Sequence, residues 1–292
     1  MQFADRKLPS GRGRIVADQP VIMWFYTKKL ILSQSVAAAV WISESLRPWG
    51  SSTPERIPRV ASLLPDVFES YVRILHPVSV NDRRGGGPEF LNWAQIAEQN
   101  GKITHPLMQF NCIDGLPVKE GRPGTRKDEP NGGSLEETSL QALVDVLSGH
   151  TATTDNCWFC LWDGYGGLKP GSATYLGPGA AKRAALEASQ TERLQAEYAD
   201  APRVKTDGRE YILFSGHLSA ADAFIKYPDN QSLNIWWPDD RAWCVATEID
   251  LQSTYVGGSA ACIDAVLNHP VLEVFPVNPG DRIDFGSDTI NC

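Results

Sequence analysis

Hydrophobic residues follow a short, strand-like pattern over much of the second half of the chain. Residues 157–162 (CWFCLW) are apolar on both faces and stop at Asp163-Gly164, which predicts a buried strand in the middle of a sheet. The Asp207-Gly208 pair between two apolar stretches is typical of a hairpin turn. Strands are expected at 157–162, 204–206, 210–214, 234–237, 242–249 and 271–277.

Other segments repeat their apolar residues at the helical spacing i, i+3, i+4, i+7. Residues 64–75 have this spacing, Pro65 suits a first helical turn, and His76 before a proline suits an end. Ser134 and Glu137 form a capping-box pattern ahead of another apolar stripe. Helices are expected at 64–75, 90–99, 134–149 and 219–227, after Ser259, and at the domain edge over 30–42.

These elements predict the fold class. The strands connect mostly as hairpins, and the helices gather between groups of strands. This order favours an α+β fold, with a mainly antiparallel sheet and helices packed on it, over a doubly wound parallel sheet.

The chain divides into an N-terminal extension and one larger domain. Residues 1–20 are basic, interrupted by Gly and Pro, and lack a hydrophobic period. Residues 1–50 are therefore predicted to be an extension that is partly disordered or weakly docked. Residues 51–292 are predicted to form a single α+β domain. Within it, we expect the Gly- and Pro-rich residues 113–133 to form a loop and residues 172–200 to form a helical insertion.

Composition narrows the classes of function. The 292 residues include 27 Lys and Arg against 35 Asp and Glu, so the formal net charge is −8, which argues against a general nucleic-acid binder. No apolar run of about 18 residues is present, so no membrane-spanning helix is expected. Six cysteines are too few for a disulfide framework, and four lie in apolar surroundings. We therefore expect buried free thiols and a reducing, cytoplasmic location.

The segment WWPDDRAW (residues 236–243) gathers aromatic and charged side chains around a tight turn. Because side chains alternate along a strand, Trp236 and Trp237 should face opposite ways, with one ring in the core and the other nearer the surface. Exposed tryptophan beside arginine is typical of a binding hot spot. The alternative is a structural hairpin in which Arg241 stacks on an aromatic ring and pairs with Asp239.

Glu248 and Asp250 fall on the same face of the returning strand, so they could bind a cation, share a proton or simply face solvent. Together with the turn they complete the set of candidate binding residues. These are Trp237, Asp239, Asp240, Arg241, Trp243, Glu248 and Asp250.

Two kinds of chemistry are weighed against binding. A hydrolase could use Ser215 and His217 with Glu248 or Asp250, but no G-x-S-x-G motif is present. The Cys157-x-x-Cys160 pair could hold a metal, but strand alternation should point its thiols to opposite faces. No catalytic residue, metal or cofactor is therefore expected.

Three stretches resemble a family of uncharacterised bacterial hypothetical proteins over about residues 45–283: LPDVFESYVRILHP, CWFCLWDGYG and WWPDDRAWCVATEID. That resemblance implies no known activity. The early L-P-x-x-F and the later Trp-rich strands are also similar to the SUKH immunity-protein superfamily, which implies an α+β domain that binds partner toxins. The chain departs from that superfamily in its length and in insertions at 113–133 and 170–200.

The sequence as a whole favours a binding protein without chemistry of its own. An acidic, immunity-type protein would complement a basic protein partner. The alternative is the hydrolase that uses Ser215 and His217.

Overall fold

The structure is a computed structural model that describes residues 30–49, 57–82, 89–114, 125–127, 129–165, 196, 198–225 and 232–292. The strands are β1 (Leu30–Leu32), β2 (Ser70–Leu75), β3 (Val78–Asp82), β4 (Glu89–Leu91), β5 (Thr125–Lys127), β6 (Cys157–Trp162), β7 (Arg203–Thr206), β8 (Arg209–Gly216), β9 (Ile235–Pro238), β10 (Trp243–Thr247), β11 (Ser253–Gly258) and β12 (Val274–Val277). The helices are α2 (Val40–Ser43), α3 (Trp93–Gln99), α4 (Phe110–Ile113), α5 (Glu137–Ser148) and α7 (Ala260–Leu267), with 3₁₀ helices at Ala37–Ala39, Val60–Ser62, Leu218–Asp222 and Phe285–Ser287.

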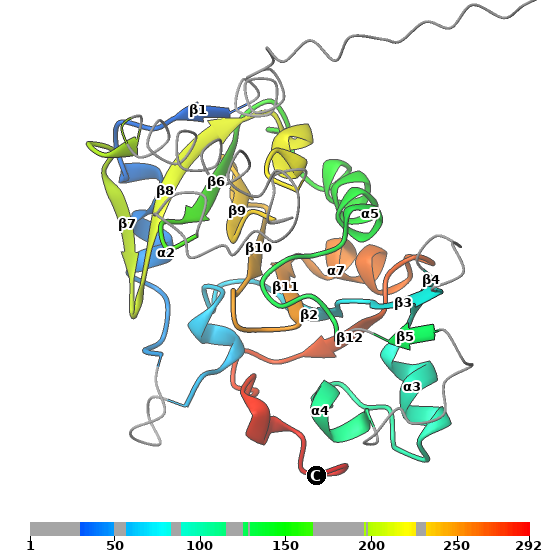
Figure 1. Cartoon of the computed structure of the whole chain (residues 1–292). Coiled ribbons are helices and arrows are strands. Elements are labelled where there is room, and N and C mark those ends of the chain that lie inside the picture. Colours follow the sequence, from blue (N-terminus) through cyan, green and yellow to red (C-terminus); the bar gives the residue numbers. More distant parts are fainter. Residues whose placement is uncertain are drawn as a thin grey trace, which may run out of the picture.

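The described strands form two antiparallel sheets (Figure 1). The larger sheet has nine strands in the order β1-β8-β6-β9-β10-β11-β2-β12, and β7 pairs with β8 beside β1. The smaller sheet has the order β4-β3-β5. The predicted α+β class with a mainly antiparallel sheet is confirmed.

Both faces of the large sheet are buried. On one face, α5, α7 and the 3₁₀ helix Leu218–Asp222 pack against Phe159, Trp236 and Val245. The other face, which includes Cys160, Trp237 and Cys244, lies under side chains from residues 36–49 and 60–64. A third cluster joins α3 and α4 to the start of β3.

The strand β6 has the bounds that the sequence predicts and lies inside the sheet, between β8 and β9. The predicted hairpin around Asp207-Gly208 is confirmed as β7 and β8, and Gly208 has φ +86°, a conformation that favours glycine. The hairpin of β9 and β10 is also confirmed.

The predicted helix over residues 64–75 is wrong, because residues 70–75 form β2. This strand pairs with β11 on one side and β12 on the other, so its side chains are buried on both faces. Tyr71 packs into one core cluster and Val72 into the other. A run that is apolar on both faces satisfies the helical spacing by chance, and strand pairing decides the outcome.

The helix α5 keeps its predicted buried stripe but not its predicted cap. Glu136 is the N-cap, and its carboxylate accepts hydrogen bonds from Thr138 N (2.9 Å) and Ser139 N (3.1 Å). The hydroxyl of Ser134 instead accepts from the backbone N–H of Ser232. The predicted cap of α7 is confirmed, because Ser259 Oγ accepts from Cys262 N.

Several element boundaries differ from those predicted. Helix α3 begins at Trp93, and Phe90 lies in β4 with 44% of its surface exposed. The expected helix over 219–227 is the shorter 3₁₀ helix Leu218–Asp222. Residues 125–127 of the predicted loop form β5. The other residues at 115–124 and 128 lie outside the described residues, as does nearly all of the predicted insertion at 172–200.

The described part of the predicted N-terminal extension packs on the large sheet. Residues 30–32 pair with β8 as β1, where a helix over 30–42 was expected. Ala39 and Ile42 are completely buried in the core cluster beneath α2. Residues 1–29 lie outside the described residues, so the predicted division at residue 50 stays a prediction.

A disulfide joins Cys112 at the end of α4 to Cys292, the last residue of the chain. Asp288 holds the same segment, because its carboxylate accepts from Gln109 N (3.1 Å) and Asn291 N (2.9 Å). The sequence analysis did not foresee this pairing. The four buried free thiols are confirmed as Cys157, Cys160, Cys244 and Cys262.

Disulfides are typical of oxidising compartments, so the cytoplasmic location stays a prediction. Within the part of the chain that the structure describes, no helix combines the length and the hydrophobicity needed to cross a bilayer.

Candidate functional site

The candidate binding residues fall into two groups at opposite ends of the hairpin of β9 and β10. Asp239, Asp240 and Arg241 form its turn. Glu248 and Asp250 follow the far end of β10 and meet Arg209 of β8. The structure therefore brings the two carboxylates together but separates them from the turn.

The turn carries a preformed aromatic and charged surface. Arg241 has φ +55°, in the left-handed region that non-glycine residues seldom adopt, and its guanidinium lies 5.1 Å from the ring centre of Trp41. The indole N–H of Trp158 donates to Asp239 Oδ1 at 2.9 Å. Trp41 and Trp158 are half-buried, so neither residue is fully covered by the fold. We call Trp41, Trp158, Asp239 and Arg241 the turn surface.

Asp240 fastens the turn to the loop before β6. Its carboxylate accepts from Thr151 Oγ1 (2.8 Å), Ala152 N (2.8 Å) and Ala242 N (3.1 Å). Burial works to raise the pKa of Asp240, but these hydrogen bonds outweigh it and lower the pKa overall. Asp240 therefore fixes the geometry of the turn and has little capacity left for a partner.

The predicted alternation of Trp236 and Trp237 is confirmed, because the two rings lie in different core clusters. The expectation that one of them lies near the surface is wrong. Trp237 and Trp243 are 1% and 0% exposed, so neither ring reaches solvent. The sequence analysis missed Trp41 and Trp158, the half-buried tryptophans beside the turn. The alternation of β6 gave a signal for Trp158, because that strand turns it away from the buried face of Phe159.

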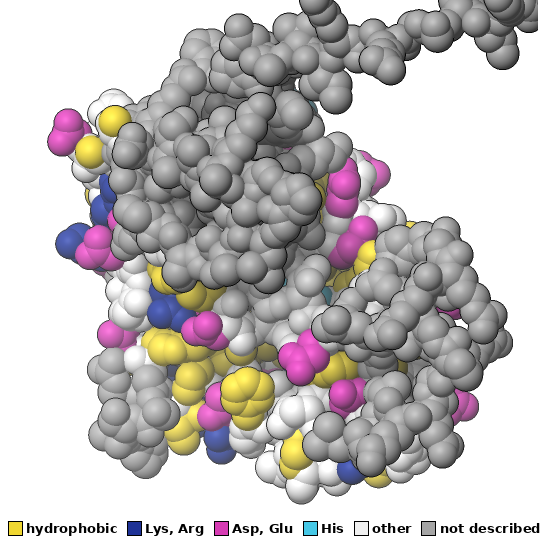
Figure 2. All heavy atoms as spheres, viewed as in Figure 1, with side chains coloured by type: hydrophobic (Ala, Val, Ile, Leu, Met, Phe, Trp, Pro, Cys, Tyr) yellow, Lys and Arg dark blue, Asp and Glu magenta, His cyan; other side chains and the backbone are white. Residues whose placement is uncertain are grey.

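Three carboxylates surround the turn end of β6. Burial is the main cause that raises the pKa of Cys157 to about 12, and the charges of Asp240, Asp155 and Asp239 add to it. The local field is therefore negative. On the face shown in Figure 2, acidic side chains are scattered over the described surface.

At the far end of β10, Arg209 joins the two predicted carboxylates. Its Nη2 lies 2.6 Å from Glu248 Oε1 and 2.6 Å from Asp250 Oδ2, and its guanidinium lies 5.7 Å from the ring centre of Trp162. Burial works to lower the pKa of Arg209, but Glu248 and Asp250 raise it overall. Burial raises the pKa of Glu248, and Arg209 opposes that shift. The sequence analysis did not single out Arg209, although it predicted the adjacent turn.

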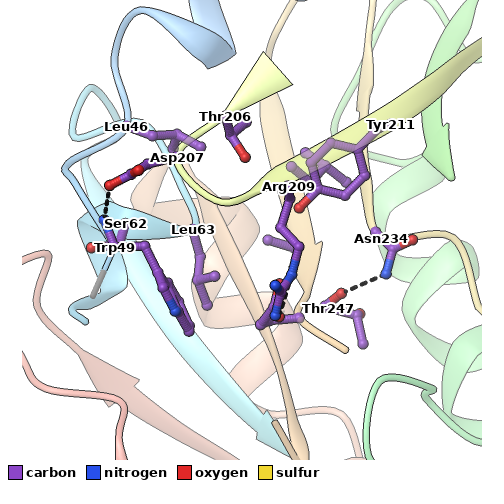
Figure 3. A pocket seen from close by; sticks show the side chains of 13 residues that line it. Leu46, Trp49, Ser62, Leu63, Thr206, Asp207, Arg209, Tyr211, Asn234 and Thr247 are labelled. Carbon is purple, nitrogen blue, oxygen red and sulfur yellow. Dashed lines mark hydrogen bonds and ion pairs between the residues drawn. The ribbon is translucent and has the colours of Figure 1, made fainter. Parts of the chain in front are cut away.

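A small pocket of about 20 Å³, partly open to solvent, lies beside this ion pair (Figure 3). Arg209 and Tyr211 line one side, and Trp49 lies on the other. Leu46 and Leu63 contribute apolar surface from the segment that covers the sheet. The whole lining comprises Leu46, Trp49, Ser62, Leu63, Thr206, Asp207, Arg209, Tyr211, Asn234, Ile235, Ala246, Thr247 and Glu248.

The residues of the alternative hydrolase are not brought together. Ser215 and His217 lie at one end of β8, whereas Glu248 and Asp250 meet Arg209 at its other end. His217 Nδ1 accepts from the backbone N–H of Ser219 at 3.0 Å, which makes His217 the N-cap of the following 3₁₀ helix.

A different group of three surrounds His217. Ser219 Oγ lies 2.9 Å from His217 Nδ1, and His217 Nε2 lies 3.5 Å from Asp155. The side chains of His217 and Asp155 are 54% and 94% exposed, and none of the three lines the pocket. This arrangement is a helix cap in open solvent.

The two thiols of the C-x-x-C pair point to opposite faces, as predicted. Cys157 belongs to one core cluster and Cys160 to the other, and burial raises the pKa of both. Among the described residues, no group of His, Cys, Asp or Glu could hold a metal ion.

No protein-family model, curated protein or solved structure matches the chain. The proposals that follow therefore rest on the geometry of the described residues.

Proposed function

We propose that this chain is a non-enzymatic binding protein that docks a basic protein partner on the turn surface. The observation that carries the proposal is Arg241, which has φ +55° and stacks on the half-buried ring of Trp41. Unfavourable backbone conformations are concentrated at sites of function.

Two further features support docking at this surface. Tryptophan and arginine are the residues most enriched among binding hot spots. Here both indoles have fixed contacts, Trp41 with Arg241 and Trp158 with Asp239. Because these side chains are already ordered, a partner loses less of its binding free energy to their immobilisation.

Charge selects the class of partner. The chain carries a net charge of −8, and Asp155, Asp239 and Asp240 lie at this end of the sheet. A basic protein would be attracted to this end, and its association rate would fall as salt increases. An immunity-type role, as the resemblance to the SUKH superfamily implies, fits such a partner.

Affinity capture from the native host with matched variants tests the proposal. Arg241→Gly removes the guanidinium and still allows the turn conformation, since glycine adopts a positive φ readily. Asp264→Asn removes one charge from the exposed side of α7, on the far face of the sheet. We expect one basic protein to be captured stoichiometrically by wild type and Asp264→Asn and lost with Arg241→Gly.

The captured protein is then purified, and its affinity is measured by calorimetry at two salt concentrations. Capture of no stoichiometric protein, or of an acidic one, would overturn the proposal. So would equal affinities for wild type and Arg241→Gly.

A further inference from the structure

We propose that the N-terminal segment, residues 1–29, docks on the turn surface of its own chain and competes there with the basic partner. Docking within the chain needs no partner, whereas the competition rests on the proposed function. The segment would then act as an inhibitor built into the chain, which the partner has to displace.

The segment and the rest of the chain have opposite charges. Residues 1–29 carry a net charge of +4, so residues 30–292 carry −12. The segment has two acidic residues, Asp5 and Asp18, against six cations, which are Arg6, Lys7, Arg12, Arg14, Lys28 and Lys29. Its charge therefore attracts it to an acidic part of the folded domain.

The carboxylates at the turn have charge left for a cationic segment. The side chain of Asp155 is 94% exposed and lies 3.5 Å from His217, and Asp239 and Asp240 are exposed as well. Among the described residues, no Lys or Arg forms an ion pair with any of these three carboxylates. Arg241 adds one positive charge, so this group carries −2 when all three carboxylates and Arg241 are ionised.

The fold brings the segment to this end of the sheet. β1 begins at Leu30, which pairs with Gly216 at the end of β8 (Figure 1). Gly216 pairs on its other side with Cys157, and Cys157 pairs with Pro238, which precedes the turn. Because neighbouring strands lie about 4.8 Å apart, Leu30 lies about 14 Å from Pro238 along this row. β1 is antiparallel to β8, so the chain before Leu30 leaves the sheet at the turn end.

The composition of the segment also suits the turn surface. Residues 21–26 (VIMWFY) are apolar, and cations lie on both sides of them in the sequence. An extended chain spans about 3.4 Å per residue, so the four residue steps from Leu30 back to Tyr26 cover about 14 Å. Residues 21–26 are therefore within reach of the half-buried Trp41 and Trp158. Because the segment is tethered, its effective concentration at this surface is high, and weak contacts suffice.

Zero-length cross-linking of the full chain tests the docking. A carbodiimide joins a lysine amine to a carboxylate in contact with it, and mass spectrometry locates the bond. At low salt we expect Lys7 to be joined to Asp155 or Asp239 of the same molecule far more often than to Asp264, which is exposed on α7. High salt should remove this preference, because it screens exposed charges.

Two double variants determine whether the cations of the segment are responsible. Arg12→Gln with Arg14→Gln removes two of these cations and keeps Lys7 as the reporter. The matched control, Arg47→Gln with Lys205→Gln, removes two exposed cations that lie outside the turn surface. We expect the first variant to lower the cross-link yield about fivefold, as for the loss of two exposed ion pairs, and the control to leave it unchanged.

The captured basic partner then tests the competition. It should bind Arg12→Gln with Arg14→Gln more tightly than wild type, because less of the turn surface is occupied, and should bind the control variant as it binds wild type. The cross-links need no partner, so failure to capture one would overturn the proposed function but not the docking.

Four results would overturn the inference. Lys7 might be joined to Asp264 as often as to Asp155 and Asp239, or the bonds might join two copies of the chain. The two double variants might change the cross-link yield equally. Finally, the captured partner might bind wild type and Arg12→Gln with Arg14→Gln with equal affinity.

Discussion

The guanidinium of Arg209 reaches Glu248 at 2.6 Å although β6 and β9 separate their strands in the sheet. This contact is possible because β6 ends at Trp162 and β9 begins at Ile235, so the sheet is notched at this edge. Asn234 fills the notch, since its side chain accepts from Trp162 N and donates to Thr247 O. The ion pair therefore joins the start of β8 to the end of β10 across this notch.

Replacement of Arg209 should destabilise the fold, because it leaves the buried carboxylate of Glu248 without its partner. Glu248 is 5% exposed, so Arg209→Met should lower the free energy of unfolding by about 3 kcal/mol, the typical effect of leaving one member of a buried pair unpartnered. The double variant Arg209→Met with Glu248→Leu should recover most of that loss. Urea denaturation of the single and double variants measures both, and strictly additive losses would contradict the coupling.

His76 should make stability depend on pH. Its Nδ1 lies 2.6 Å from the carbonyl of Asn131, so it carries the proton, and Nε2 accepts from Thr254 Oγ1 at 2.9 Å. Burial, assisted by the charge of Arg73, lowers the pKa of His76 from 6.5 to about 4. The neutral folded form therefore contributes stability in full above pH 6.5, and this is lost as pH falls towards 4.

The size of this effect can be measured by urea denaturation at two pH values. His76 alone should make the wild type about 2 kcal/mol less stable at pH 5 than at pH 7.5. The variant His76→Gln should lack that component, because it cannot take up the proton. An unchanged pH dependence in the variant would show that another group is responsible.

Reduction of the disulfide should destabilise the fold. The bond joins residues separated by 180 positions, and loss of a native disulfide typically costs about 3 kcal/mol. Cys292→Ser should therefore unfold at lower urea concentration than the oxidised wild type. A reducing agent should bring the wild type down to the variant and leave the variant unchanged. A wild type that is insensitive to reductant would contradict a stabilising bond.

The left-handed conformation of Arg241 should affect the free energy of unfolding as well as partner binding. Arg241→Ala and Arg241→Gly both remove the stack on Trp41, but only alanine keeps the unfavourable backbone. The glycine variant should be more stable than the alanine variant by about 1 kcal/mol. Thermal unfolding of the pair provides the measurement, and equal midpoints would mean that the turn relaxes in the variants.

Local patterns predicted the parts of the fold that local sequence determines. The bounds of β6 follow from its apolar run, and the turn between β7 and β8 follows from Asp207-Gly208. The apolar residues of β2 fit the spacing of a helix as well as that of a buried strand. Only the pairing of β2 with β11 and β12 decides between the two. The cap of α5 failed for a related reason, since Ser134 bonds to Ser232, about a hundred positions away.

The candidate site was also predicted only where the signal lies in the local sequence. Glu248 and Asp250 were predicted from their alternation, but their partner Arg209 lies about 40 positions earlier and carries no motif of its own. Composition suggested an exposed tryptophan in the β9–β10 hairpin, but residues 36–49 and 60–64 cover the hairpin on one face of the sheet and the helices cover it on the other. Burial depends on what packs over a strand, which the strand's own sequence does not contain.

The bond between Cys112 and Cys292 makes a covalent ring of every residue between them. Arg209 and Arg241 lie inside that ring, whereas Trp41 and Trp49 lie outside it. A protease that cuts once inside the ring leaves its two pieces attached until a thiol opens it. A single cut between Trp49 and Cys112 instead leaves the fragment that carries Trp41 and Trp49 without a covalent link to the rest of the chain.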